Sequence, residues 1–106
     1  MRVSIITPSF NSASTIADCI ASVCNQSCPD LEHIIIDGAS GDDTLKIIES
    51  IPNRVTRIVS ERDSGIYSAL NKGIELAEGD IIGLLHTDDK FASDTIIEQV
   101  QKLFLE

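Results

Sequence analysis

Asp88 and Asp89 are adjacent carboxylates that follow an apolar run of strand length, residues 81–85. Two carboxylates at the end of such a strand repel each other unless a cation or hydrogen-bond donors satisfy them. Mg²⁺ and Mn²⁺ favour oxygen ligands, and Mg²⁺ is usually held by one or two carboxylates together with substrate phosphates. The pair therefore indicates a site for a divalent cation and a phosphorylated ligand. The competing interpretation is that both residues simply lead into the following loop.

Polar residues also follow two other apolar runs, residues 3–7 and 31–36. The first run leads into Thr7-Pro8-Ser9-Phe10-Asn11, and the second ends at Asp37-Gly38. Because ligands of parallel sheets bind outside the carboxyl ends of the strands, we expect these polar residues to meet the Asp88-Asp89 pair in one crevice. Taken alone, an Asp after a strand is more often a turn or helix-capping residue.

Apolar runs of strand length alternate with segments of helical period along the whole chain. The runs cover residues 3–7, 31–36, 54–59 and 81–85. This alternation predicts an α/β fold, a three-layer, Rossmann-like parallel sheet with right-handed crossovers and helices on both faces. Since residues 54–59 alternate in polarity like an edge strand, we expect the strand order 3-2-1-4. Residues 1–106 are predicted to form a single domain.

The last two predicted helices carry the most detailed expectations. The third is expected to end at Gly79 as its C-terminal cap and to turn one stripe of side chains inward. That stripe consists of Ile66, Leu70, Gly73, Ile74 and Ala77. The final helix is expected to open near Ser93 and to bury its apolar face against the sheet. That face consists of Ile96, Ile97, Val100, Leu103 and Phe104.

The charge balance limits the partners that this protein can have. Eight Lys and Arg residues against 17 Asp and Glu residues give a net charge of −9. Such a field repels nucleic acid and anionic lipid, but a small phosphorylated ligand remains compatible where a divalent cation offsets the carboxylates. Neither a GxGxxG nor a GxxxxGK[ST] fingerprint occurs, which argues against a dinucleotide-binding domain and a P-loop NTPase.

Cysteine usage and hydropathy bear on the compartment. Cys19, Cys24 and Cys28 form no CxxC pair and are predicted to be reduced thiols without a metal or redox role. No apolar run is long enough for a signal peptide or a transmembrane segment. We therefore expect a cytoplasmic protein with no transmembrane segment, with a peripheral position on the inner face of the membrane as the alternative for a full-length protein.

Four ordered segments carry a resemblance to a known family. They are Val3 to Asn11, Ile35 to Thr44, Glu61 to Gly73, and Leu85-His86-Thr87-Asp88-Asp89. Together they resemble a family-2 glycosyltransferase of the GT-A fold, and they match its N-terminal nucleotide-sugar-binding half. Thr87 stands where a strict DxD element has its first Asp, and His86 stands where the family often has Asn.

The resemblance implies a role for each matching residue. Thr7, Pro8 and Ser9 would line the nucleoside pocket, and Asp37 would accept a hydrogen bond from an N–H of the base. Asp63 would border the nucleotide and the sugar. Asp88 would approach the ribose or sugar, and Asp89 would ligate Mn²⁺ or Mg²⁺. Lys72 has two equally weighted interpretations, an exposed ion pair with Glu75 and a contact to the nucleotide.

The implied reaction is transfer of a sugar from a nucleoside diphosphate to an acceptor hydroxyl with inversion. Inversion needs a general base, and the family takes it from sequence well downstream of the DxD-type element. We therefore expect the base beyond residue 106 and a truncated chain that binds the donor without the acceptor site. The alternatives are a sugar nucleotidyltransferase and a non-catalytic interaction module. Self-association through the exposed edge of the fourth strand or through the truncated face is also expected.

Overall fold

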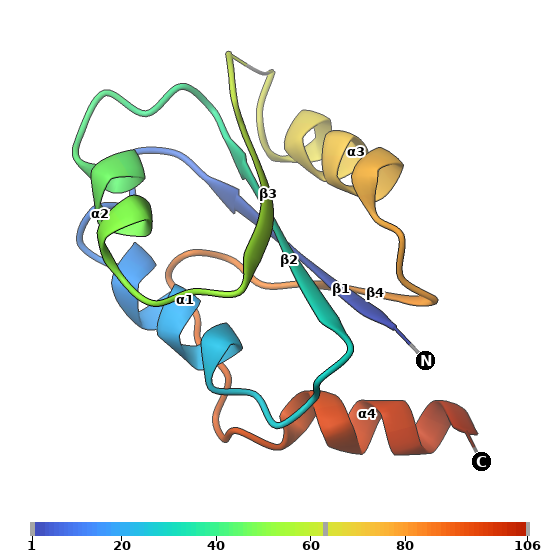
Figure 1. The fold of residues 1–106 in the computed structure, drawn as a ribbon. Coiled ribbons are helices and arrows are strands. Elements are labelled where there is room, and N and C mark those ends of the chain that lie inside the picture. The colour runs from blue at the N-terminus through green and yellow to red at the C-terminus, as the bar shows by residue number, and fades with distance from the viewer. Residues whose placement is uncertain (1, 63, 106) are drawn as a thin grey trace.

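The computed structural model describes residues 2–62 and 64–105. Strands and helices alternate along the chain (Figure 1). The strands are β1 (Val3–Ser9), β2 (Leu31–Asp37), β3 (Val55–Ser60) and β4 (Ile81–Leu84). The helices are α1 (Ile16–Cys24), α2 (Thr44–Ser50), α3 (Ile66–Leu76) and α4 (Ile96–Leu105). All strand pairs are parallel and the order is β3-β2-β1-β4, which confirms the predicted topology.

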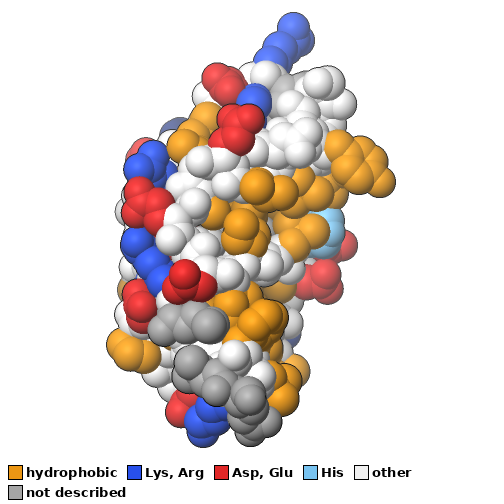
Figure 2. Space-filling view, turned by 90° about the vertical axis from the view of Figure 1, so that its right-hand side faces the viewer, with side chains coloured by type: hydrophobic (Ala, Val, Ile, Leu, Met, Phe, Trp, Pro, Cys, Tyr) orange, Lys and Arg blue, Asp and Glu red, His pale blue; other side chains and the backbone are white. Residues whose placement is uncertain are grey.

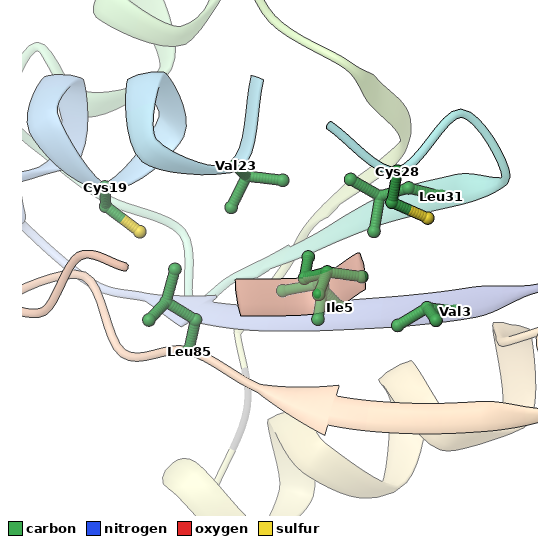
Figure 3. Close-up of a cluster of buried hydrophobic side chains, with 8 residues drawn as sticks. Val3, Ile5, Cys19, Val23, Cys28, Leu31 and Leu85 are labelled. Atoms are coloured by element: carbon green, nitrogen blue, oxygen red, sulfur yellow. The ribbon is translucent and has the colours of Figure 1, made fainter. Parts of the chain in front are cut away.

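Helices cover both faces of the sheet, as predicted. On one face Ile6, Ile34 and Ile36 pack against Ala69 of α3. On the other face α1, α2 and α4 cover the strands (Figure 1). Figure 3 shows Cys19 and Val23 of α1 directed toward the strands. Every residue of β2 is buried, because helices cover both of its faces and a strand flanks each of its edges.

The register aligns the carboxyl ends of the central strands. Ser9 of β1 lies opposite Asp37 of β2, and Asp37 lies opposite Ser60 of β3. β4 pairs with the first part of β1, from Val3 opposite Ile81 to Ile6 opposite Leu84. The segments that follow the strands therefore emerge at one edge of the sheet.

Small residues let α3 approach the sheet closely. A Cβ on Gly73 would lie 2.5 Å from Cγ2 of Ile6, so only glycine fits. The inward residues of α3 are accordingly Ala69 and Gly73, whereas Ile66 and Ile74 are 42% and 51% exposed. The predicted stripe was wrong for these two isoleucines, because a helix held this close by small residues leaves its larger side chains on the flank.

Two predicted helix boundaries also differ from the structure. The C-cap of α3 is Ala77 in an extended conformation, not Gly79. Gly79 is instead required by crowding in the turn before β4, because a Cβ there would lie 2.5 Å from Ser4 Oγ and 2.8 Å from Ser4 N. The last helix begins at Ile96, three residues after Ser93.

α4 buries less of its apolar face than predicted. Ile97 is buried with Val3 and Ile5 of β1, whereas Leu103 and Phe104 are 69% and 60% exposed. The helix reaches the core through its first turn, and its second half runs beside the sheet (Figure 1). The inward placement predicted for Leu103 and Phe104 was therefore wrong.

Hydrophobic side chains remain exposed on the face formed by α3 and β4. Ile74, Ile82 and Leu84 are each between 45% and 51% exposed, and Figure 2 shows hydrophobic side chains gathered as a band on this face. Ile82 and Leu84 lie opposite Ser4 and Ile6, and α3 packs over Ile6 on this side of the sheet. β3 and β4 form the two edges of the sheet. Cys19, Cys24 and Cys28 form no disulfide with one another.

Candidate functional site at the carboxyl ends of the strands

Backbone hydrogen bonds join the segments that leave the strands. Gly38 N donates to Ser9 O at 2.9 Å, Leu85 N donates to Ile6 O at 3.0 Å, and Glu61 N donates to Asp37 O at 3.0 Å. These bonds extend the sheet beyond the regular strands. They fix the start of each following loop relative to its neighbour.

Asp37 is a fully buried carboxylate held by serine donors. Oδ1 accepts the hydroxyls of Ser9 at 2.7 Å and Ser40 at 2.5 Å. Oδ2 accepts the Ser40 N–H at 2.8 Å and the Ser60 hydroxyl at 2.8 Å. Burial raises the pKa of this carboxyl, but the bonds from Ser40, Ser9 and Ser60 together outweigh that effect and lower the pKa below its ordinary value. Asp37 is therefore ionised at neutral pH.

The four hydrogen bonds bear on the predicted role of Asp37. A carboxylate has about four lone-pair positions, and the protein occupies all of them here. A nucleobase N–H can bind Asp37 only in exchange for one serine donor. Asp37 thus lies beneath the surface. The neighbouring residues Ser9 and Gly38 line a cavity at this edge of the sheet.

A cavity of about 430 Å³ opens on the α3 side of the carboxyl ends. Its lining residues are Pro8, Ser9, Phe10, Gly38, Arg62, Gly65, Ile66, Ala69 and His86. Pro8 and Ser9 were predicted as site residues. Phe10, Arg62 and His86 were not assigned a binding role, although all three lie within the motif segments of the sequence. The cavity combines an apolar wall with one guanidinium.

Asp88 and Asp89 lie beside a second cavity of about 240 Å³. This cavity is lined by Ser14, Thr15, Asp18, Thr87, Asp88, Asp89 and Lys90. Both carboxylates are exposed. The expectation of one shared crevice was therefore wrong in detail, because residues 86–90 separate two neighbouring cavities. His86 faces the first, and Thr87 to Lys90 face the second.

The turn that carries Asp89 is fastened at two points. Asp89 N donates to the carbonyl oxygen of His86 at 3.0 Å, and the hydroxyls of Thr87 and Ser12 lie 2.9 Å apart. This second contact links the end of β4 to the segment after β1. The turn therefore presents the Asp88 and Asp89 carboxylates from a defined backbone.

The Asp88 and Asp89 carboxylates suit a divalent cation that is also coordinated by a substrate phosphate. Within residues 2–62 and 64–105, no cluster of three or more His, Cys, Asp or Glu side chains is arranged to hold a metal. A cation bound only by protein would need more ligands than the pair supplies. Mg²⁺ commonly binds one or two carboxylates and completes its shell with water and substrate phosphates. Two exposed, adjacent carboxylates meet this requirement.

Two other predicted site residues, Thr7 and Lys72, have surroundings that differ from those expected. Thr7 is fully buried and its hydroxyl lies 2.8 Å from His33 Nε2, so its side chain points into the core. Lys72 pairs with Glu61 at 2.8 Å, not with Glu75 as one interpretation expected. Asp63 lies outside the described residues.

Cys19 lies directly beneath the 86–89 turn. Its Sγ donates to the His86 carbonyl at 3.6 Å. Burial raises the pKa of this thiol to about 11, a hydrogen bond with Thr7 opposes the rise, and the charges of Asp89 and Asp88 add to it. The thiol therefore remains protonated at neutral pH and acts as a donor.

The fold and the site together define a class of protein. A parallel sheet of order β3-β2-β1-β4 has its reversal between β1 and β4, and the cavities and carboxylates lie at that point. Ligand sites of nucleotide-binding α/β proteins occupy this position. The chain belongs to glycosyl transferase family 2, whose family model matches residues 4–105.

Two curated relatives support the family assignment. The putative teichuronic acid biosynthesis glycosyltransferase TuaG of Bacillus subtilis (strain 168) is 39% identical over 102 residues, which cover 93% of this chain and 40% of the relative. A PGL/p-HBAD biosynthesis glycosyltransferase of Mycobacterium bovis (strain BCG / Pasteur 1173P2) is 38% identical over 97 residues, 88% of this chain and 38% of the relative. The chain thus spans about two fifths of these relatives.

Solved structures share the fold over almost the whole chain. The mannosyltransferase PcManGT of Pyrobaculum calidifontis, in complex with GDP-Man and Mn²⁺, has a TM-score of 0.89 at 26% identity, covering 99% of this chain and 32% of that one. S. aureus TarS 1-349 in complex with UDP-GlcNAc has a TM-score of 0.89 at 24% identity, covering 98% and 31%. The GT-A fold predicted from the sequence is confirmed.

Proposed function

We propose that this chain binds a nucleoside-diphosphate sugar together with Mn²⁺ or Mg²⁺, for inverting transfer of the sugar to an acceptor hydroxyl. The observation that carries the proposal is the cavity at the strand reversal with the exposed Asp88-Asp89 pair beside it. Support comes from the structurally similar mannosyltransferase PcManGT, which was solved in complex with GDP-Man and Mn²⁺. The family match favours this function over a nucleotidyltransferase or a non-catalytic module.

The larger cavity suits the nucleoside. Pro8, Phe10 and Ile66 offer apolar surface to the base and ribose, while Ser9 offers a hydroxyl and Arg62 a positive charge. Asp37 keeps Ser9 and Ser40 in place through its hydrogen bonds. In this arrangement Asp37 orders the pocket wall, and it contacts the base only by exchanging one serine donor.

The exposed pair suits the diphosphate side of the ligand. Asp89 would hold the cation, and Asp88 would face the ribose or sugar. A bound divalent cation supplies Lewis-acid stabilisation of the negative charge left on the departing diphosphate. Lys72 lies on α3 and forms an ion pair at 2.8 Å with Glu61, which follows β3.

The acceptor side requires a carboxylate base for the attacking hydroxyl. Because the curated relatives are much longer than this chain, we assign the base and the acceptor site to polypeptide outside residues 1–106.

The cytoplasmic location remains a prediction. No helix in the described ranges combines the length and apolarity needed to cross a bilayer.

A thermal-shift and calorimetric screen tests the proposal. UDP, GDP, CMP and dTDP are titrated with and without Mn²⁺, and a ligand that binds only the folded state raises the unfolding temperature. We expect at least one diphosphate to bind in a metal-dependent manner, and Asp89→Asn to abolish that dependence. Asp43→Asn, at an exposed acid that lines neither cavity, is the matched control. Equal binding with and without Mn²⁺ would contradict the proposal.

A further inference from the structure

A chain of polar groups crosses the interior beneath the 86–89 turn. His33 of β2 is 0% exposed, and its Nε2 lies 2.8 Å from Thr7 Oγ1 of β1. The Thr7 hydroxyl acts in turn on the Cys19 thiol of α1, whose pKa it lowers. Cys19 Sγ in turn donates to the carbonyl oxygen of His86 at 3.6 Å. The central strands and α1 are thereby connected to the segment after β4.

The chemistry of these groups sets the direction of the chain. A carbonyl oxygen only accepts, so the single thiol proton of Cys19 goes to His86. We therefore expect Thr7 to direct its one proton toward the sulfur and His33 to donate to Thr7 from Nε2. This order leaves Nδ1 of His33 as a bare acceptor. Nδ1 is the only buried side-chain nitrogen or oxygen without a partner in the described part of the chain.

The His86 carbonyl connects this chain to the proposed site. The same oxygen accepts the Asp89 N–H at 3.0 Å, so it ends the buried chain and closes the turn that presents Asp89. We infer that Cys19 and His33 are positioning residues, which hold the His86 carbonyl and through it the backbone of Asp89. The inference takes its functional meaning from the proposed function, whereas the hydrogen-bond chain can be tested without it.

Packing alone does not require a thiol at position 19. Cys19 lies in an aliphatic cluster with Ile5, Val23 and Leu85 (Figure 3), where an apolar side chain would serve equally well. Cys28 belongs to the same cluster and is equally buried, at 1% exposed. Cys28→Ala therefore removes the same atoms from the same core without touching the chain of donors. It is the matched control for Cys19→Ala.

The first test is nitrogen-15 NMR of the free protein. We expect the wild-type His33 ring in the Nε2–H tautomer, and a shifted Asp89 amide resonance in Cys19→Ala. Cys19→Ser keeps a donor and is expected to restore the resonance, while Cys28→Ala leaves it unchanged. A His33 proton on Nδ1, or an Asp89 amide that does not respond to Cys19→Ala, overturns the inference. If Cys19→Ala does not fold, the His33 tautomer of the wild type and the Asp89 amide resonance of Cys19→Ser still test the inference.

The second test is calorimetric titration with UDP and GDP in the presence of Mn²⁺. Loss of a group that orients a metal ligand typically weakens metal binding about 10-fold or more, and we expect a loss of that order in Cys19→Ala. Cys19→Ser and Cys28→Ala are expected to bind like the wild type. Wild-type affinity in Cys19→Ala overturns the positioning role. Metal-independent binding in the wild type refutes the proposed function instead, and the NMR test then decides the chain of donors.

Discussion

At the scale of single residues, the fold decides how buried polar groups ionise. Asp37 is kept charged in the interior by four donors from Ser9, Ser40 and Ser60. Glu32 is a second case at the opposite end of the sheet, where Ser4, the Glu78 N–H and Arg2 contact a carboxylate that is 2% exposed. Burial raises the pKa of Glu32, and these donors and charges more than reverse the effect. In both carboxyl groups the donors stabilise the charged form against the cost of burial.

Asp37→Asn should destabilise the protein by about 2 kcal/mol, because the new amide N–H₂ faces hydroxyl donors that lose their charged acceptor. The free energy of unfolding in urea measures this effect at neutral pH. The lowered pKa of Asp37 means that its contribution is present above the pKa of the unfolded state and is lost as the pH falls. Asp43→Asn, on an exposed acid, is expected to change stability little. Equal losses in the two variants would show that the serine donors do not stabilise the carboxylate.

Because His33 is buried, we expect the protein to lose stability in acid at a higher pH than the carboxylates alone would cause. Burial lowers the pKa of His33 from 6.5 to about 4. Between these values the unfolded chain binds a proton that the folded chain does not, so stability falls as the pH is lowered through this window. The full effect is about 3 kcal/mol. Urea unfolding of His33→Gln across the window should give a flatter pH dependence than the wild type. An unchanged slope would assign the acid sensitivity to other groups.

At the scale of elements, the glycine of the Asn71-Lys72-Gly73 segment positions α3 against β1. Gly73→Ala should destabilise the protein by about 1–3 kcal/mol, because the added Cβ would lie 2.5 Å from Cγ2 of Ile6, a side chain that is 1% exposed. Thermal unfolding measures the loss. Gly41→Ala is the control, since its nearest neighbour would be Asn11 Oδ1 at 4.0 Å. Since α3 also carries Ile66 and Ala69 of the larger cavity, the variant should weaken nucleotide binding as well. Wild-type stability would refute the close approach.

At the scale of the whole molecule, the net charge of −9 opposes an anionic ligand. A cation that accompanies a nucleoside diphosphate reduces this repulsion, and salt screens it, with a Debye length of about 30 Å at 0.01 M and about 8 Å at 0.15 M ionic strength. We therefore expect Mn²⁺ to improve nucleotide affinity more at low than at physiological ionic strength. Calorimetry at both salt concentrations measures the difference. If the gain in nucleotide affinity from Mn²⁺ is the same at both salt concentrations, Mn²⁺ acts only by direct coordination and not by reducing long-range repulsion.

The alternation of apolar runs and helical segments was sufficient to predict the sheet, its order and its helix layers. Buried strands such as Ile34-Ile35-Ile36 are apolar on both faces, whereas an edge strand such as residues 54–59 is not. The composition of each strand therefore predicts whether it lies in the centre or at the edge of the sheet. Polar residues directly after strands also marked the edge of the sheet at which the two cavities lie. Those features depend on neighbours in sequence, which is why they could be predicted from it.

Contacts between distant residues required the tertiary structure. Whether Asp37 faces a ligand or three serines depends on residues up to 28 positions away, and the same holds for the pairing of Lys72 with Glu61 and the exposure of Leu103. The division into two cavities follows from residues 86–90, of which His86 lines the larger cavity and Thr87 to Lys90 line the smaller one. Sequence patterns report the period of burial along one element, whereas the packing of elements decides which polar atoms meet and which remain free to bind.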